Sequence, residues 1–330
     1  MSDVALNETN MMAGTAATRA SVLTRLRTTD TAFRNLTRLA VFAVLALLSG
    51  VILALVIGSV PAFKAFGFGF VTTEIWNPVT EKFGALAPIY GTLVTSFIAL
   101  VIAVPVGLMI ALFLTELCPL WLRRPIAIAI ELLAGIPSII YGIWGLFVFA
   151  PFLQQHVQPA IINLFSGVPF LNALFAGPPY GIGVFTAGLI LAIMVIPFIS
   201  SISRDVFETT PSVLKESAYA LGATTWEVIW DVVLPYSRAG VLGGVMLGLG
   251  RALGETMAVT FVIGNAHKIA ASIMAPGTTI SATIANEFTE AVGDIYTSAL
   301  IALGLILFVI TFIVLAFARY MLSRMEVKTG

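Results

Sequence analysis

The chain has 330 residues, of which 59% are hydrophobic and only 10% are charged. A soluble domain of this size does not have so few charges, so the composition predicts an all-α polytopic membrane protein. The 17 basic and 17 acidic side chains cancel, so net charge gives no indication of a nucleic-acid or acidic partner. Because Cys118 is the single cysteine, an internal disulfide and a cysteine-based metal cluster are excluded.

The N-terminal residues 1–35 are rich in Ser, Thr and Ala with scattered Arg, so we expect a disordered or surface-lying tail. Residues 36–60 are apolar and too many for the hydrophobic part of a signal peptide, which indicates a first transmembrane helix. Apolar runs of similar length recur along residues 88–319 and predict five more spans, over residues 88–115, 125–150, 180–201, 239–264 and 298–318.

The segment between the third and fourth predicted spans contains a short apolar stretch over residues 161–175. Gly167 and Pro169 interrupt it, and it is shorter than the roughly 20 residues that cross the hydrocarbon as a helix. We therefore expect an interfacial or re-entrant segment here rather than a further crossing.

Basic side chains gather in four regions of the sequence. These regions are the N-terminal tail, a short loop with Arg123 and Arg124, a polar segment over residues 210–236, and the C-terminus. Six spans place all four regions on one side of the membrane. The bias of Lys and Arg toward the inner face makes that side cytoplasmic, so we expect both termini in the cytoplasm.

The polar segment between the fourth and fifth predicted spans has the pattern of two short helices joined by a turn. Thr210 can cap the first helix, and Gly222 suits the turn that follows it. Thr224 and Glu227 form a capping box for the second helix, which we expect Pro235 to end. A turn in lipid would leave backbone groups unpaired, so this hairpin must lie in water or against a soluble partner.

Two charges, Arg251 and Glu255, lie inside the fifth predicted span. On a continuous helix they share one arc with Gly240, Gly244 and Gly248, and glycines at this spacing allow close approach of another helix. Charges on such an arc point into protein or a wet cavity. Two interpretations remain open. Either the two side chains pair with each other or with a neighbouring helix, or Arg251 attracts an oxyanion that Glu255 helps to bind.

Hydroxyl side chains also occur in the second and fifth predicted spans, where they either line a solute path or bond back to their own helix. They are Thr92, Thr95, Ser96, Thr256 and Thr260. Two further carboxylates lie near the inner ends of spans. We expect Glu131 to snorkel or to pair with another helix, and Glu116 to be an ordinary interfacial charge.

The remaining polar residues favour no catalytic or metal chemistry. His156 and His267 are isolated, so no metal site is predicted, and an intramembrane enzyme would lack its nucleophile, base or metal ligands. The sequence has no phosphate-binding loop of the G-x-x-x-x-G-K-[ST] type, so ATP, if used, binds to another chain. The simplest interpretation of three acidic residues, Glu287, Glu290 and Asp294, is a solvated face, which could also help to dock an external partner.

From Glu216 onward the sequence follows the pattern E-S-A-x-x-x-G-x(9)-V-x-L-P. This pattern resembles the EAA loop of ABC-importer permeases, E-A-A-x-x-x-G-x(9)-I-x-L-P, with Ser217 and Val232 as departures. The resemblance implies a type I importer permease fold with a cytoplasmic coupling-helix hairpin that docks on an ATPase. The docking residues that it implies are Glu216, Ser217, Ala218, Gly222, Leu234 and Pro235.

Longer stretches, such as PIYGTLVTSFIAL and GLGRALGETMAVTFVIGN, are similar to the PstC-like permease family of phosphate-specific importers. This resemblance implies phosphate import across a bacterial inner membrane by alternating access, with Arg251 and Glu255 relevant to transport. The implied partners are a PstA-like second permease, a PstB-like ATPase dimer that holds ATP and Mg, and a PstS-like external binding protein. This chain itself would bind no cofactor.

Two alternatives stay open from the residues alone. A permease for another oxyanion, such as sulfate or molybdate, needs the same charge and hydrogen-bond chemistry. An ion-driven carrier or a channel is also compatible with six spans, but it has no need of a hairpin that docks on an ATPase.

Overall fold

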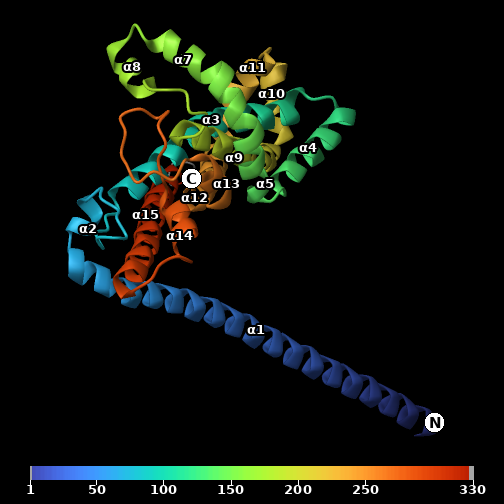
Figure 1. The fold of residues 1–330 in the computed structure, drawn as a ribbon. Helices are drawn as coiled ribbons and strands as arrows, with labels where there is room; N and C mark the ends of the chain where they lie inside the picture. Colours follow the sequence, from blue (N-terminus) through green and yellow to red (C-terminus); the bar gives the residue numbers. More distant parts are fainter. Residues whose placement is uncertain (1, 327–330) are drawn as a thin grey trace. The chain divides into compact units, whose positions relative to one another are not determined.

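The computed structural model describes the backbone of residues 2–326 and the side chains of residues 30–168 and 170–324. The described chain is almost entirely helical, as predicted (Figure 1). It divides into two compact units, one up to Ile57 and one from Gly58 onward. Within the described residues, six helical segments are long and apolar enough to cross a membrane: Asp30–Phe66, Leu86–Leu117, Ser138–Phe165, Val184–Glu208, Thr225–Gly254 and Asp294–Arg324.

The first unit consists of helix α1 (Ser2–Phe66) up to Ile57. The structure therefore has a helix over residues where the sequence indicated a disordered or surface-lying tail. Residues 2–35 contain no proline, and Gly14 is the one glycine among them, so little in this stretch opposes extension of a helix from the apolar run that follows.

The second unit contains the remaining elements, several of which are joined without a break through short π-helical turns, labelled η. They are α2 (Gly69–Thr72), α3 (Leu86–Leu112), η1 (Phe113–Leu117), α4 (Leu120–Ala134), α5 (Ser138–Trp144), η2 (Gly145–Phe149), α6 (Ala150–Phe152), η3 (Leu153–Val157), α7 (Gln158–Phe165), α8 (Pro169–Phe175), α9 (Val184–Glu208), α10 (Ser212–Ala220), α11 (Thr225–Val228), η4 (Ile229–Val233), α12 (Leu234–Gly254), α13 (Met257–Val262), α14 (Ile280–Glu287) and α15 (Asp294–Glu326).

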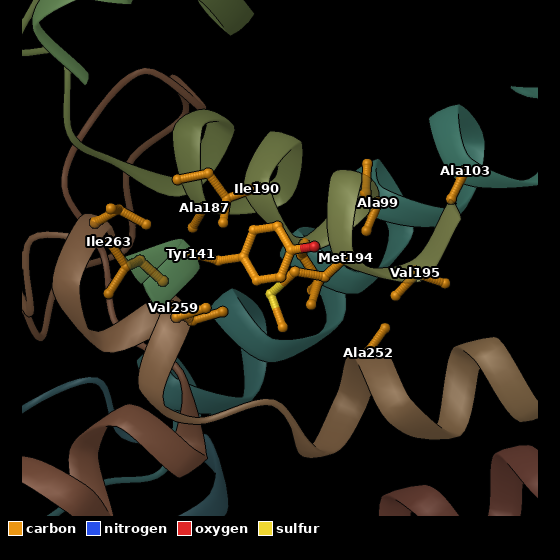
Figure 2. Close-up of a cluster of buried hydrophobic side chains, with 14 of the residues drawn as sticks. Ala99, Ala103, Tyr141, Ala187, Ile190, Met194, Val195, Ala252, Val259 and Ile263 are labelled. Atoms are coloured by element: carbon orange, nitrogen blue, oxygen red, sulfur yellow. The ribbon is translucent and has the colours of Figure 1, made fainter. Parts of the chain in front are cut away.

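Helix α9 is the central helix of the second unit. Of its most apolar 18-residue window 61% is buried, against 22–28% in the other spans of this unit. It packs most extensively along α3. Figure 2 shows the core that results, in which Tyr141 of α5 lies among side chains of α3, α9, α12 and α13. The helices that build the core therefore also hold the fifth span, which contains the predicted solute-path charges.

The contact between α12 and α9 depends on glycine, as the sequence predicted. A Cβ atom added to Gly240, Gly244 or Gly248 would lie 2.5–2.9 Å from a valine or isoleucine side chain of α9. Real Cβ atoms do not approach other atoms so closely, so only glycine allows the two helices to pack at this distance.

The third span differs from the continuous helix expected over residues 125–150. Helix α4 ends at Ala134, and a new helix begins at Ser138 and runs on to Phe165. Pro137 lacks a backbone N–H and disfavours helical geometry at the residue before it, which explains the break. The apolar stretch 161–175 forms the end of this span and then the separate short helix α8.

The fifth span also differs from the prediction at both ends. It begins at Thr225 and continues through Pro235, so the expected stop at this proline is wrong. The π-turn η4 explains the continuation. In this turn the Leu234 N–H donates to the Ile229 carbonyl, five residues back instead of four. The hydrogen bonds of the helix have therefore already shifted by one residue where Pro235 follows. The helix then ends at Gly254, ten residues earlier than expected.

Candidate functional site

The fifth span is broken at the position of its two charges. After α12 ends at Gly254, Glu255 has an extended backbone (φ −68°, ψ 131°), and α13 begins at Met257. Figure 2 shows the ribbon unwinding between the two helices. A helix end within an apolar span leaves backbone groups without helical partners. Such breaks occur at membrane depth only where protein or a water-filled cavity surrounds them.

The break changes the predicted relation between Arg251 and Glu255. The sequence placed them one turn apart on a continuous helix, but Glu255 lies beyond the last helical residue and so outside that arc. The side chain of Arg251 is exposed, and its guanidinium carbon lies 6.0 Å from the ring centroid of Phe198 in α9. Among the described residues no ion pair joins Arg251 to a carboxylate. The proposed Arg251–Glu255 pair is therefore not formed in this structure.

A second break lies in a neighbouring element. Helix α5 starts after Pro137, and its Tyr141 hydroxyl donates a 2.9 Å hydrogen bond to the carbonyl of Leu133 near the end of α4. The same carbonyl also accepts the Ile136 N–H at 3.3 Å, so this bond adds a side-chain contact from α5 to the end of α4. Gly142 of α5 packs against α13, since a Cβ there would lie 3.1 Å from Cα of Ala258. The segments that follow the two breaks therefore pack against each other.

The predicted hydroxyls lie in two different environments. Thr256 is in the break itself, where its hydroxyl donates to the Gly254 carbonyl at 3.3 Å. Thr92 and Thr95 are 2% and 1% exposed. Their hydroxyls donate to carbonyls of their own helix, and Thr92 Oγ1 also accepts the N–H of Ile280 at the start of α14. The structure does not bring these two residues together with Arg251 through any hydrogen bond, and their place on a solute path stays a prediction.

The polar hairpin has the expected turn and the expected capping box. Gly222 has φ +90°, a conformation that other residues rarely adopt. The Thr224 hydroxyl accepts the Glu227 N–H, and the Glu227 carboxylate accepts the Thr224 N–H at 2.7 Å. Thr210, however, does not cap α10. Its hydroxyl is buried without a hydrogen-bond partner among the described residues, and α10 begins only at Ser212.

The surface of this hairpin is apolar as well as polar. Glu216, Ser217, Gly222 and Pro235 are exposed, whereas Ala218 and Leu234 are half-buried against the rest of the unit. The same hairpin exposes large apolar side chains: Val213, Leu214, Tyr219, Leu221, Trp226 and Trp230. An apolar patch of this kind on a polar hairpin is typical of a surface that binds another protein.

Glu131 and Glu116 both pair with cations of other helices. Arg204 of α9 lies 2.9 Å from Glu131, which is one of the two outcomes that we expected for this carboxylate. Glu116 is not an ordinary interfacial charge. Its side chain is 8% exposed, and it lies 2.5 Å from the ammonium group of Lys215 in α10.

Glu287 is the centre of a polar cluster that the sequence did not predict. Its carboxylate accepts hydrogen bonds from Trp76 Nε1 at 2.6 Å and from the Tyr296 hydroxyl at 2.8 Å, and it lies 2.8 Å from His267 Nε2. The rings of His267 and Trp76 stack at 5.2 Å. Glu287 is therefore not part of a solvated face, and His267 is not isolated.

The pKa of Glu287 reflects these contacts. Burial alone raises the pKa, but the hydrogen bonds from His267, Tyr296 and Trp76 outweigh burial and hold the pKa below its usual range. The four side chains come from three separate parts of the sequence, so no local pattern could have revealed the cluster. The charged carboxylate holds these parts together.

Comparisons with known proteins agree with this architecture. Residues 103–327 match the family described as binding-protein-dependent transport system inner membrane component. The chain is 68% identical over 314 residues to a protein from Mesorhizobium japonicum named phosphate transport system permease protein PstC, covering 95% of this chain and 96% of the relative. A protein of the same name from Pasteurella multocida is 59% identical and covers 90% of this chain and 93% of its own length.

Among solved structures, a bacterial alginate ABC transporter in complex with its alginate-bound periplasmic protein matches with a TM-score of 0.55. That alignment covers 88% of this chain and 96% of the other, at 21% identity, so it bears on the fold alone. The fold is the type I ABC importer permease fold that the resemblance implied. The family match covers more than half of the chain, so the chain belongs to the binding-protein-dependent transport system inner membrane component family.

Proposed function

We propose that this chain is the transmembrane permease subunit of an ATP-driven importer that moves inorganic phosphate into the cytoplasm by alternating access. The names of the two relatives, which are identical at 59% or more of the aligned positions, support the substrate. The structural observation that carries the proposal is Arg251, a cation beside a broken membrane helix that forms no ion pair with a carboxylate of the described residues.

Arg251 suits a transient contact with an oxyanion. Its guanidinium group has forked N–H donors that match two oxygens of a phosphate, and its charge offsets part of the cost of bringing that anion out of water. A carboxylate paired to Arg251 would compete with the solute. In this proposal Glu255 and Thr256, which lie in the break, exchange hydrogen bonds with a protonated phosphate. Binding must stay weak, because a tightly held ion would not be released.

The partners follow from the family and the exposed hairpin. Importers of this family work with an ATPase and an external binding protein, and we propose PstB-like and PstS-like chains in these roles, beside a PstA-like second permease. Helix α10 and its apolar surround form the proposed ATPase contact, with Glu216, Ala218 and Gly222 at its centre. ATP and Mg would bind to the ATPase, since this sequence has no phosphate-binding loop.

The proposed orientation in a bacterial cytoplasmic membrane places both termini and the hairpin inside. The basic flanks support this orientation, because Arg123, Arg124 and Lys215 lie in segments that six crossings bring to the same face. A permease for sulfate or molybdate would use the same fold and the same arginine. The names of the relatives favour phosphate over these anions.

Uptake into vesicles tests the substrate. The chain is assembled with its partner subunits, ATP is supplied on the ATPase side, and labelled phosphate import is measured with and without excess sulfate or molybdate. We expect ATP-dependent phosphate import that neither competitor reduces. Import that sulfate or molybdate suppresses, or an active ATPase without phosphate import, would contradict the assignment.

A further inference from the structure

The ion pair between Lys215 and Glu116 joins the proposed ATPase-docking hairpin to a membrane span. Lys215 is in α10, and Glu116 is in η1, the π-helical turn that continues α3. The Nζ and Oε1 atoms lie 2.5 Å apart, and the side chains are only 19% and 8% exposed. Two charges so far from water attract each other strongly, and removal of either leaves the other uncompensated.

Helix α3 connects this pair to the opposite end of the unit. Its 27 residues make a rod about 40 Å long. At its other end, Gly91 packs so closely on the carbonyl of Thr278 that a Cβ would lie 1.8 Å from that oxygen. Nearby, Thr92 accepts the N–H of Ile280. The helix that continues into η1 and Glu116 therefore also contacts the loop before α14.

The other contacts of the hairpin do not fix its position along α3 in the same way. One of these contacts is with an apolar cluster of Ala111, Phe207, Val228 and Val233, against which Ala218 of α10 packs. Apolar contact is non-directional, so it holds the surfaces together without setting their register. The Lys215 ammonium group also donates a hydrogen bond to Oε1 of Glu116, and this directional contact joins one atom of α10 to one atom of η1.

A second cation stabilises the same end of α3. The guanidinium group of Arg123, in α4, donates a 2.6 Å hydrogen bond to the carbonyl of Thr115, next to Glu116. A cation at the C-terminal end of a helix complements the unpaired carbonyls and the helix dipole there. The turn that contains Glu116 is therefore also held by a contact with α4.

We propose that Lys215 and Glu116 are positioning residues through which movement of the hairpin displaces α3, so that ATP hydrolysis is coupled to transport. This inference rests on the proposed function. It assigns no contact with the solute to either residue. Its consequence is that loss of the pair should separate ATP hydrolysis from import rather than lower both together.

The test measures phosphate imported per ATP hydrolysed by the assembled transporter in vesicles. Glu116→Gln and Lys215→Met remove one charge each, whereas Lys215→Arg keeps the cation and a double variant, Glu116→Lys with Lys215→Glu, exchanges the charges. Glu131→Gln is the matched control, because its pair with Arg204 is also an ion pair between helices but Glu131 is half-exposed. The amount of assembled complex is measured for every variant.

We expect Glu116→Gln and Lys215→Met to keep hydrolysing ATP while the ratio of phosphate to ATP falls roughly tenfold, within the range for side chains that transmit coupling. Lys215→Arg and the charge exchange should restore most of that ratio, and Glu131→Gln should leave it unchanged. If the charge-exchanged double variant does not assemble, the test is whether Lys215→Arg has a higher ratio of phosphate to ATP than Lys215→Met.

A ratio that stays at the wild-type value in both single variants would overturn the inference. Loss of hydrolysis and import in equal proportion to loss of assembled complex would also overturn it, because the pair would then be structural. Failure of the proposed function would be seen in the wild type itself, which would then hydrolyse ATP without importing phosphate.

Discussion

Replacing Glu287 by glutamine should loosen the cluster that holds three parts of the sequence together. The carboxylate accepts from Trp76 and Tyr296 through Oε2 and pairs with His267 through Oε1. Glutamine can keep one oxygen in the Oε2 position, where it still accepts two hydrogen bonds without the charge. Its NH₂ group then faces His267.

The magnitude follows from these contacts. Two charge-assisted hydrogen bonds become neutral, which costs roughly 1 kcal/mol or somewhat more in total, and the third must reorganise around a donor, so the total loss is about 2 kcal/mol. For a unit of this size, 1 kcal/mol corresponds to a shift of about 2–4 °C in the unfolding midpoint. We therefore expect the midpoint to fall by about 4–8 °C on that scale.

Thermal unfolding of the purified protein in detergent, followed by tryptophan fluorescence, measures this shift. Glu290→Gln is the control, since Glu290 is exposed and follows Glu287 by three residues; its midpoint should stay close to that of the wild type. An equal shift in the two variants, or no shift in Glu287→Gln, would refute the view that the cluster stabilises the fold.

Three further outcomes are expected. The pKa of Glu287 lies below its ordinary value of 4.5, so the carboxylate stabilises the fold fully above that pH. This stabilisation is lost as pH falls through the lowered pKa, and the thermal unfolding midpoints of wild type and Glu287→Gln should therefore converge in acid. Gly91→Ala places a Cβ against the Thr278 carbonyl and should destabilise by about 1–3 kcal/mol, whereas Gly243→Ala, with open space around it, should not, as thermal unfolding would show. Gly222→Ala forces φ +90° on alanine and should cost about 1 kcal/mol or more at the hairpin turn, measured as weaker co-purification of the ATPase.

The spans and the hairpin could be predicted because each depends on local composition. Apolar runs of sufficient length indicate helices that cross a membrane, and the capping box of Thr224 and Glu227 needs only two residues at a fixed spacing. The glycines of α12 could be predicted for the same reason, since a regular spacing on one helix face is visible in the sequence.

The errors arose where the backbone departs from a regular α-helix. Arg251 and Glu255 are one turn apart only on a continuous helix, and the break after Gly254 removes that relation. Pro235 ends a regular helix but not one whose register has already shifted in η4. Pro137 lies within the apolar run that predicts the third span, and the break between α4 and α5 lies at this proline.

Contacts between distant parts of the sequence could not be predicted at all. Glu287 forms a hydrogen bond with Trp76, 211 positions away in the sequence, and Glu116 forms one with Lys215, 99 positions away. Each of these carboxylates is an unremarkable surface charge by its local sequence. Their roles depend on packing that brings separate helices together, which no periodicity encodes.

The role of Arg251 in the solute path is tested by phosphate import in Arg251→Gln, compared with wild type in vesicles in which both assemble with a working ATPase. Glutamine keeps much of the length and some hydrogen-bonding capacity of arginine but removes the charge. We predict that ATP hydrolysis persists and phosphate import is lost, with Arg251→Lys retaining part of it. Import by Arg251→Gln at the wild-type rate would contradict the placement of the solute path at the break after α12.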